Sequence, residues 1–463
     1  MVTGLAIPNN LTADDLLTYH VRILLRGLLD RKVKVCSYAA DGTGIERGVQ
    51  KLFTALASDF KLVTIKHLGK GRLDITLKIP LFGKDRHPVA IIQDSKHGGK
   101  TYRNNAFSGA RLLILGNYMV MYSQFQAIAF EDGPLYNCDV EKLDRQDDTA
   151  ATHLGSADVL QWLANHYPQH LGPIVYLFIF YELIDAYQNH RMKHVERAQL
   201  ALRALFFMEM WEDFLEKAGY AKAKHFLSHE ACDITHFLIH GLLQLIIIYR
   251  DDLDGVYPLL PWLLSTEICK HVFGLCRQII KDFTMLDFYY MIPKLFIRLR
   301  EHSLFSKFSD GKERASGYSH TYITDNRDVD LVALSLYPSD EEINDATKTA
   351  YEEAENLWTL LGAPSSAPRI PSIRLPSIRA WFTEQEPSED IATDEEIFSD
   401  YDSCVGDADL DNNDEESESA QIQKALNYLE TVTIKLSQEE NKINDLALAA
   451  VSLSVGDGMA MYV

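Results

Sequence analysis

Two aspartates occupy positions where α/β proteins often carry out chemistry. Asp41 ends an apolar segment that begins at Val33, and Asp94 ends the apolar segment Val89–Gln93. If both segments are neighbouring parallel strands, the two carboxylates meet at one edge of the sheet. Carboxylates gathered there can hold Mg²⁺, which prefers oxygen ligands and can activate water or a 3′-hydroxyl for phosphodiester chemistry. The alternative is that each aspartate only caps the helix after it.

The residues after Asp94 also suit a phosphate-binding loop. The sequence SKHGGKTYRNN predicts a basic, glycine-containing loop over 95–100, followed by a helix near Asn104–Leu115. Gly99, Lys100 and Thr101 match the end of a P-loop motif, whose first glycine would fall on Asp94. A carboxylate there would repel phosphates. A nucleotide-binding α/β protein that uses Gly99-Lys100-Thr101 remains an alternative.

A third acid lies far along the chain. Glu267 belongs to a predicted helix within YPLLPWLLSTEICKHVFGLCRQI (257–279), whose other side is apolar. Lys270 and Arg277 are among the polar residues of the same segment. A glutamate on an otherwise apolar helix indicates a partner for the strand-end acids.

These motifs, taken in chain order, resemble those of the P-element and hAT transposases. SYAADGTGIERGVQ around Asp41 resembles that family's strand ending in Ser/Thr-Asp-Gly. DSKHGGKTYRNN resembles its Asp-x-x-His-x-x-Lys-x-x-Arg-Asn motif, and LSTEICKHVFGLCR resembles its closing helix, where a glutamate precedes Phe-Gly-x-x-Arg. FYELIDAYQNHR (180–191) is similar to a segment of the family's helical insertion. The resemblance covers roughly residues 10–305.

The resemblance implies an α/β fold with an RNase H-like DDE core, interrupted by a large all-α insertion. It implies Mg²⁺-dependent cleavage and strand transfer of DNA ends, with Glu267 as the last catalytic acid and Asp41 as the second. Both would be metal ligands, with Asp94 an auxiliary acid beside them. The chain begins at the helix before Asp41, so the core is expected to lack its first strands and its first acid, which predicts an inactive or weakly active chain. The residues expected to bind DNA are Lys96, Lys100, Arg103 and Arg277.

The missing acid favours an alternative from another class, a domesticated, non-catalytic DNA- or protein-binding protein. In P-element relatives the insertion binds GTP, and no recognisable guanine motif is present here. A homo-oligomer or another helix is an expected partner for a predicted amphipathic helix at 419–455. DNA resembling transposon ends is the other expected partner.

Charge is distributed unevenly along the 463 residues. The net charge is −21, but 16 acidic residues and no lysine or arginine lie between Glu384 and Glu418. Subtracting −16 from −21 leaves −5 for the rest, which can carry local basic patches. Too few apolar residues accompany this acidic run for it to fold alone, which predicts a disordered tail.

The hydrophobic pattern predicts how the chain is organised. Six cysteines without a CxxC pair, no signal peptide and no apolar run of membrane-spanning length indicate an intracellular protein rather than a secreted or membrane one. The transposase resemblance implies the nucleus. Long amphipathic helices are predicted from 157 to 304, and one more at 340–361. The predicted parts are an α/β core (1–150), a helical insertion (151–260), closing core helices (261–305), a loop and helix (306–365), a Pro/Arg linker with the acidic tail (366–418), and the amphipathic helix (419–455).

Overall fold

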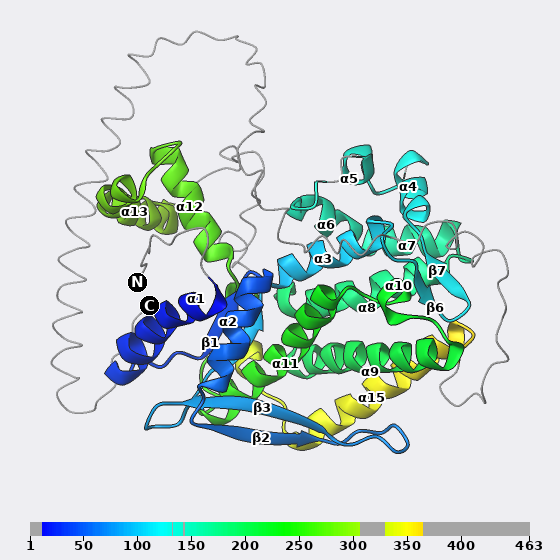
Figure 1. Ribbon diagram of the computed structural model, residues 1–463, viewed down its shortest axis with the longest axis horizontal. Helices are drawn as coiled ribbons and strands as arrows, with labels where there is room; N and C mark the ends of the chain where they lie inside the picture. The colour runs from blue at the N-terminus through cyan, green and yellow to red at the C-terminus, as the bar shows by residue number, and fades with distance from the viewer. Residues whose placement is uncertain (1–11, 132, 142–143, 306–328, 364–463) are drawn as a thin grey trace, which may run out of the picture. The chain divides into compact units, whose positions relative to one another are not determined.

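The structure is a computed structural model that describes residues 12–131, 133–141, 144–305 and 329–363 (Figure 1). The predicted linker and acidic tail (366–418) and the predicted helix 419–455 lie outside the described residues. Within them the chain is a mixed α/β protein in which helices predominate and the strands form small sheets. The predicted α/β class is confirmed at this level, whereas the described strands do not establish an RNase H-like core.

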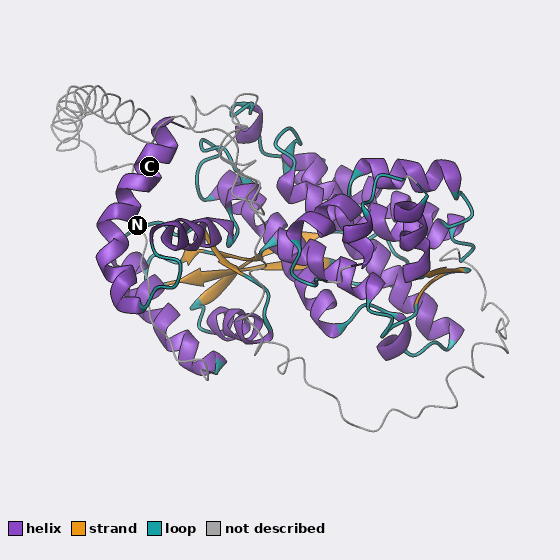
Figure 2. Cartoon of the chain, turned by 90° about the horizontal axis from the view of Figure 1, so that it is seen from above, coloured by secondary structure: helices purple, strands orange, loops and turns teal. Residues whose placement is uncertain are grey.

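The strands are arranged around one short parallel pair. β1 (Ser37–Ala40) runs parallel to β5 (Ala90–Gln93), and an antiparallel sheet has the order β2 (Asp59–Ile65), β3 (Ile75–Phe82), β4 (His87–Pro88). β4 leads directly into β5. The Val89 N–H donates to the carbonyl of Pro80 in β3, and the N–H of the next residue, Ala90, donates to the carbonyl of Cys36 just before β1. Figure 2 shows the strands of this region between helices. The condition under which the two strand-end acids meet, a parallel pairing of their strands, is therefore fulfilled.

The N-terminal helical segment begins at a capped helix and continues to Arg31. Thr12 caps α1 (Ala13–His20) through a capping box with Asp15, as expected for a threonine before an apolar-periodic segment. The helical path continues through a π-helical stretch (Val21–Leu28) and a 3₁₀ turn (Leu29–Arg31). Its apolar side packs with α2 (Gly44–Ala55) against β1 and β5.

The stretch after Asp94 corrects the prediction of a loop. Helix α3 spans Ser95–Phe107 and starts directly after Asp94, and the predicted helix to Leu115 gives way to a hairpin, β6 (Leu113–Leu115) and β7 (Tyr118–Val120). Gly98 lies in α3 where α11 packs against it. A Cβ at this position would come within 2.8 Å of Leu238 Cδ1, which explains why the residue is glycine. The glycines therefore serve close helix packing, a tertiary requirement that local propensity does not reveal.

The helices predicted from 157 onward are present, and those up to residue 251 share a core with the strands. The long ones are α8 (Leu171–Gln188), α9 (His194–Ala218), α11 (His229–Asp251) and α15 (Asp340–Leu360). Gln244 of α11 joins the two sheets, since its side chain accepts from the Ile91 N–H and donates to the carbonyl of Lys78. The shorter elements are α4 (Tyr122–Phe130), α5 (Asn137–Glu141), α6 (Asp148–Leu154), α7 (Ala157–His166), α10 (Lys222–His225) and the 3₁₀ turns Pro261–Leu263 and Ala333–Ser335.

Helix α11 is the one described helix whose length and composition would suit a membrane span. It packs against β5 and is mostly buried inside the protein, as the central helix of a globular core is. Length and hydropathy alone are therefore weak evidence for a membrane.

Two further helices follow the helical block. α12 (Glu267–Ile279) and α13 (Met285–Phe305) pack together around a small core of their own, which includes Val272 and Cys276 from α12 and Phe288 and Met291 from α13. Figure 1 shows α13 beside α12. The first turn of α12 reaches the two strand-end aspartates.

Candidate active site

The parallel pairing of β1 and β5 places Asp41 beside Asp94. Ala40 is in register with Gln93, so each aspartate is the first residue after its strand, and the Asp94 N–H donates to the carbonyl of Ala40 at 2.9 Å. Asp94 is fully buried, whereas the Asp41 side chain is 36% exposed. The pair thus has one carboxylate inside the protein and one at the surface.

The glycine after Asp41 is required by the turn that follows β1. Gly42 has a φ of +90°, which L side chains rarely adopt, and a Cβ there would lie 2.8 Å from Gln93 Oε1 and 2.9 Å from His97 Cδ2. The turn lets the ring of His97 approach Asp41, with Nδ1 3.9 Å from Oδ1. Burial lowers the pKa of His97, which favours the neutral ring.

The two aspartates differ in how they relate to the next helix. Asp94 is the N-cap of α3, and its Oδ1 accepts from the Lys96 N–H at 3.0 Å. Asp41 caps nothing, because Thr43 is the N-cap of α2. Instead the Asp41 N–H donates to Oε2 of Glu46 at 2.6 Å. The capping interpretation therefore holds for Asp94 and is wrong for Asp41.

Helix α12 brings a hydroxyl and a cation to both carboxylates. The Thr266 Oγ1 lies 2.6 Å from Oδ2 of Asp94 and 3.1 Å from Oδ1 of Asp41. The Lys270 Nζ lies 3.3 Å from each of the same two oxygens. Two carboxylate oxygens therefore face one common point, and a positive charge is already close to it.

These partners keep the buried carboxylate ionised. Burial of Asp94 acts to raise its pKa, but the charge of Lys270 and the hydrogen bonds from Thr266 and the Lys96 N–H outweigh that effect, so the pKa lies below its ordinary value. Burial prevails at the neighbouring Glu46 and raises the pKa of that carboxyl, with Asp41 adding to the rise by like-charge repulsion. The site therefore holds one strongly ionised carboxylate and one that protonates more readily.

Glu267 is the first residue of α12, directly after Thr266. The position of its side chain lies outside what the structure describes, so its predicted contact with Asp41 stays a prediction. Among the described side chains, no group of three or more His, Cys, Asp or Glu is placed to hold a metal ion. The described donor set for a cation is thus the two carboxylate oxygens of Asp41 and Asp94.

The residues predicted to bind DNA fall into two groups. Lys100 is buried and pairs with Asp148 at 3.1 Å, and the buried guanidinium of Arg103 donates to the carbonyls of Asp139 and Asp144. Their charges are used inside the protein, which counts against a contact with DNA. Lys96 lies at a pocket close to Asp94, and Arg277 is exposed on α12.

The buried position of Lys100 also bears on the nucleotide-binding alternative. Gly99, Lys100 and Thr101 lie inside α3, and Lys100 and Thr101 are each only 6% exposed. A P-loop needs free backbone N–H groups that curve around phosphates, whereas these residues continue a helix. The geometry therefore offers no phosphate loop at this place.

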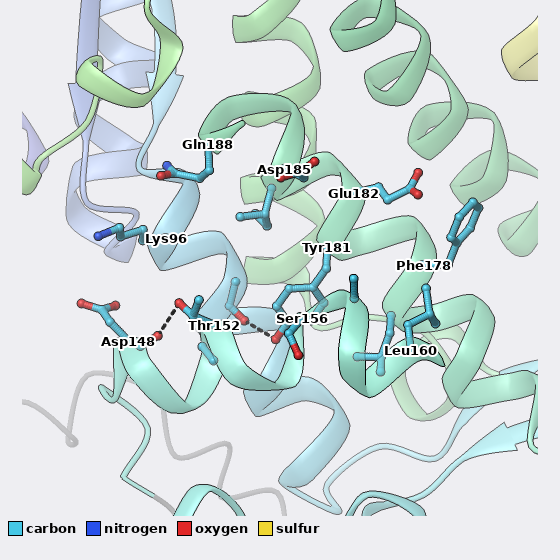
Figure 3. Close-up of a pocket in the computed structure, with 16 residues that line it drawn as sticks. Lys96, Asp148, Thr152, Ser156, Leu160, Phe178, Tyr181, Glu182, Asp185 and Gln188 are labelled. Atoms are coloured by element: carbon cyan, nitrogen blue, oxygen red, sulfur yellow. Dashed lines mark hydrogen bonds between the residues drawn. The ribbon is translucent and has the colours of Figure 1, made fainter. Parts of the chain in front are cut away.

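A pocket of about 360 Å³ adjoins the start of α3 (Figure 3). Lys96 and Gln188 lie at one end and Phe178 at the other, and the Gln188 amide donates to the Ser95 hydroxyl at 2.6 Å. Asp148, Glu182 and Asp185 add three acidic groups to the lining. Acidic groups repel a triphosphate, so the lining gives no support to a GTP site in the helical region.

Comparisons with models of protein families, with curated proteins and with solved structures found no match for this chain.

The sequence did not identify two of the side chains that complete the site. In the sequence Lys270 is one of several polar residues on the predicted helix, and no motif marks Thr266. Both lie on the same side of α12, four residues apart, which is the spacing that brings helical side chains together. This spacing is the signal that was available, but only the packing of α12 against the strand ends shows what the two residues contact.

Proposed function

We propose that this protein is derived from a transposase and that Asp41, Asp94 and Glu267 form its acidic set for metal-dependent phosphodiester chemistry on DNA. The observation that carries the proposal is the parallel pair β1–β5, which ends in two carboxylates facing one cation-binding point. Sequence reasoning gave Asp94 an auxiliary role and left the acidic set incomplete. The pairing with Asp41 supports an equal role for Asp94.

The residues fit a divalent cation by their chemistry. Oδ1 of Asp41 and Oδ2 of Asp94 are hard oxygen ligands that already share a hydroxyl and an ammonium group. Mg²⁺ bound there would activate the attacking water or 3′-hydroxyl and stabilise the leaving oxygen. The chain's own contribution is to keep Asp94 ionised and held by the α3 N-terminus, to hold Asp41 at the surface, and to place Glu267 at the start of α12.

The non-catalytic alternative rests on Lys270. Its ammonium lies where it neutralises both carboxylates without any metal, so the same residues can serve as an internal ion-pair network that fixes α12. In that case the protein would keep the architecture for binding DNA or protein and would cut nothing. The two functions differ in whether Asp41, which contributes no helix cap, is needed for cleavage.

A nicking assay on supercoiled plasmid with Mg²⁺ or Mn²⁺ tests the proposal. We expect the wild type to nick, and Asp41→Asn, Asp94→Asn and Glu267→Gln each to lose nicking. Asparagine still caps a helix, so Asp94→Asn tests the charge rather than the fold. Asp158→Asn, an exposed acid in the first turn of α7, is the matched control and should nick normally. No nicking by the wild type, or equal nicking by all variants, rejects the catalytic function.

A further inference from the structure

Helix α13 has a buried apolar face and a second face that exposes large aromatic side chains. Phe288, Met291 and Leu295 are buried against α12. On the other side of the helix Tyr289 is 67% exposed and Tyr290 is 70% exposed. An amphipathic surface helix normally exposes polar side chains on its outer face, so this second face indicates a binding surface.

Basic and aromatic side chains alternate along the exposed face. Tyr289, Phe296 and Arg300 follow one another at intervals of seven and four residues, which places them on one line of the helix surface. Tyr290, Lys294 and Ile297, at intervals of four and three residues, form a second line beside it. All six side chains are exposed. The face therefore combines flat rings with positive charges rather than being purely apolar.

The positive charges of the helix pair α12–α13 are available to a partner. Lys294 and Arg300 on α13, together with Arg277 and Lys281 at the end of α12, are exposed, and none of the four forms an ion pair with another described residue. Most other cations near the site are used internally, as with Lys100 and Arg103. The helix pair that begins at the acidic site thus carries four exposed cations that have no ion pair with another described residue.

We propose that this face of α13 binds a single-stranded segment of DNA next to the acidic site. The proposal rests on the proposed function for its choice of DNA. Bases of any sequence stack on exposed aromatic rings, and interleaved lysine and arginine side chains neutralise the phosphates between them. The first turn of α12 contacts Asp41 and Asp94 through Thr266 and Lys270, so the helix pair that carries the exposed face begins at the acids.

Charge argues against a second copy of the chain as the occupant. In a twofold dimer the same patch meets itself, so a self-associated α13 face would bring the like charges of Lys294 and Arg300 together with those of the other copy. A polyanion removes that repulsion. The aromatic rings and the cations are then used by the same ligand.

The test measures binding of the full-length protein to a fluorescein-labelled single strand of about 20 nucleotides by anisotropy, in EDTA so that no cleavage contributes. We expect the double variant Tyr289→Ala/Tyr290→Ala to bind about tenfold more weakly or worse. Tyr136→Ala, which removes a similarly exposed ring elsewhere, should bind as the wild type does. Circular dichroism verifies that each variant is folded.

The salt dependence gives an independent measurement. For Lys294→Ala/Arg300→Ala we expect the slope of log affinity against log salt to become shallower by about 1.4, from two phosphate contacts at about 0.7 each. Lys84→Ala/Lys217→Ala removes two exposed lysines elsewhere and should leave the slope unchanged. Unchanged affinity and slope in both α13 variants overturn the proposal. So does sedimentation that shows a dimer dissociated by the tyrosine substitutions, because the face would then bind a second copy. The binding test and the catalysis test are independent. Asp41→Asn should lose nicking and still bind the single strand in EDTA as tightly as the wild type does.

Discussion

Replacing Lys270 with methionine should reveal whether the two aspartates form a cation site. The ammonium lies 3.3 Å from one oxygen of Asp94 and 3.3 Å from one oxygen of Asp41. Coulomb's law at an effective dielectric constant of about 20 gives about 5 kcal/mol for each such pair before desolvation. Desolvation and the 36% exposure of the Asp41 side chain reduce these Coulomb energies strongly. We therefore expect Lys270→Met to lower the free energy of unfolding by about 2 kcal/mol at neutral pH, a value between those of an exposed and a buried ion pair.

The pH dependence of that loss has a definite sign. Lys270 helps hold the pKa of Asp94 below its ordinary value, so the wild type gains stability from this group above the ordinary aspartate pKa. That gain disappears as the pH falls through the lowered pKa of the folded state. The difference between wild type and Lys270→Met should therefore be full at pH 7 and shrink in acid, as measured by urea unfolding at several pH values.

The same substitution should make the protein respond to divalent cations. Without the ammonium, Mg²⁺ or Mn²⁺ meets two uncompensated carboxylates, and binding to the folded state raises the free energy of unfolding. We expect millimolar Mg²⁺ to stabilise Lys270→Met more than the wild type. Lys281→Met, an exposed lysine after α12, is the control for charge alone. If Lys270→Met unfolds as the wild type does, or shows no greater response to Mg²⁺, the reasoning is refuted.

Three further substitutions test the structure around the site. Gly42→Ala should lose about 1–3 kcal/mol of stability in thermal unfolding, because φ is +90° and the new methyl group meets Gln93 and His97; an unchanged melting temperature would contradict this geometry. Asp94→Ala should be about 1 kcal/mol or more less stable than Asp94→Asn, since only asparagine keeps the α3 cap, and equal urea midpoints would argue against the cap. Arg103→Met should destabilise by about 2–4 kcal/mol by leaving the carbonyls of Asp139 and Asp144 unpaired, without altering the salt dependence of DNA binding; a shallower slope would show that Arg103 contacts phosphate.

Local patterns predicted much of the fold because the signals they use act over a few residues. Thr12 caps α1 as its position before an apolar-periodic segment indicates, and the long helices from α7 to α13 follow the helical spacing of their apolar residues. The loop predicted after Asp94 was wrong for the opposite reason, because distant contacts decide the conformation there. Glycines usually indicate a loop, but Gly98 and Gly99 lie in a helix packed against α8 and α11, and those contacts come from residues over 80 positions away.

The sequence by itself determined that Asp41 and Asp94 follow two apolar strands and that Glu267 lies on a distant helix. It could not rank the acids, because their roles depend on which strands are neighbours, and the paired residues of β1 and β5 lie 53 positions apart in the sequence. Tertiary structure alone decided that Asp94 is buried, that Asp41 is not a helix cap, and that Lys270 bridges the two. The physical reason is that residue types set local conformation, whereas burial and charge pairing arise only when distant segments pack together.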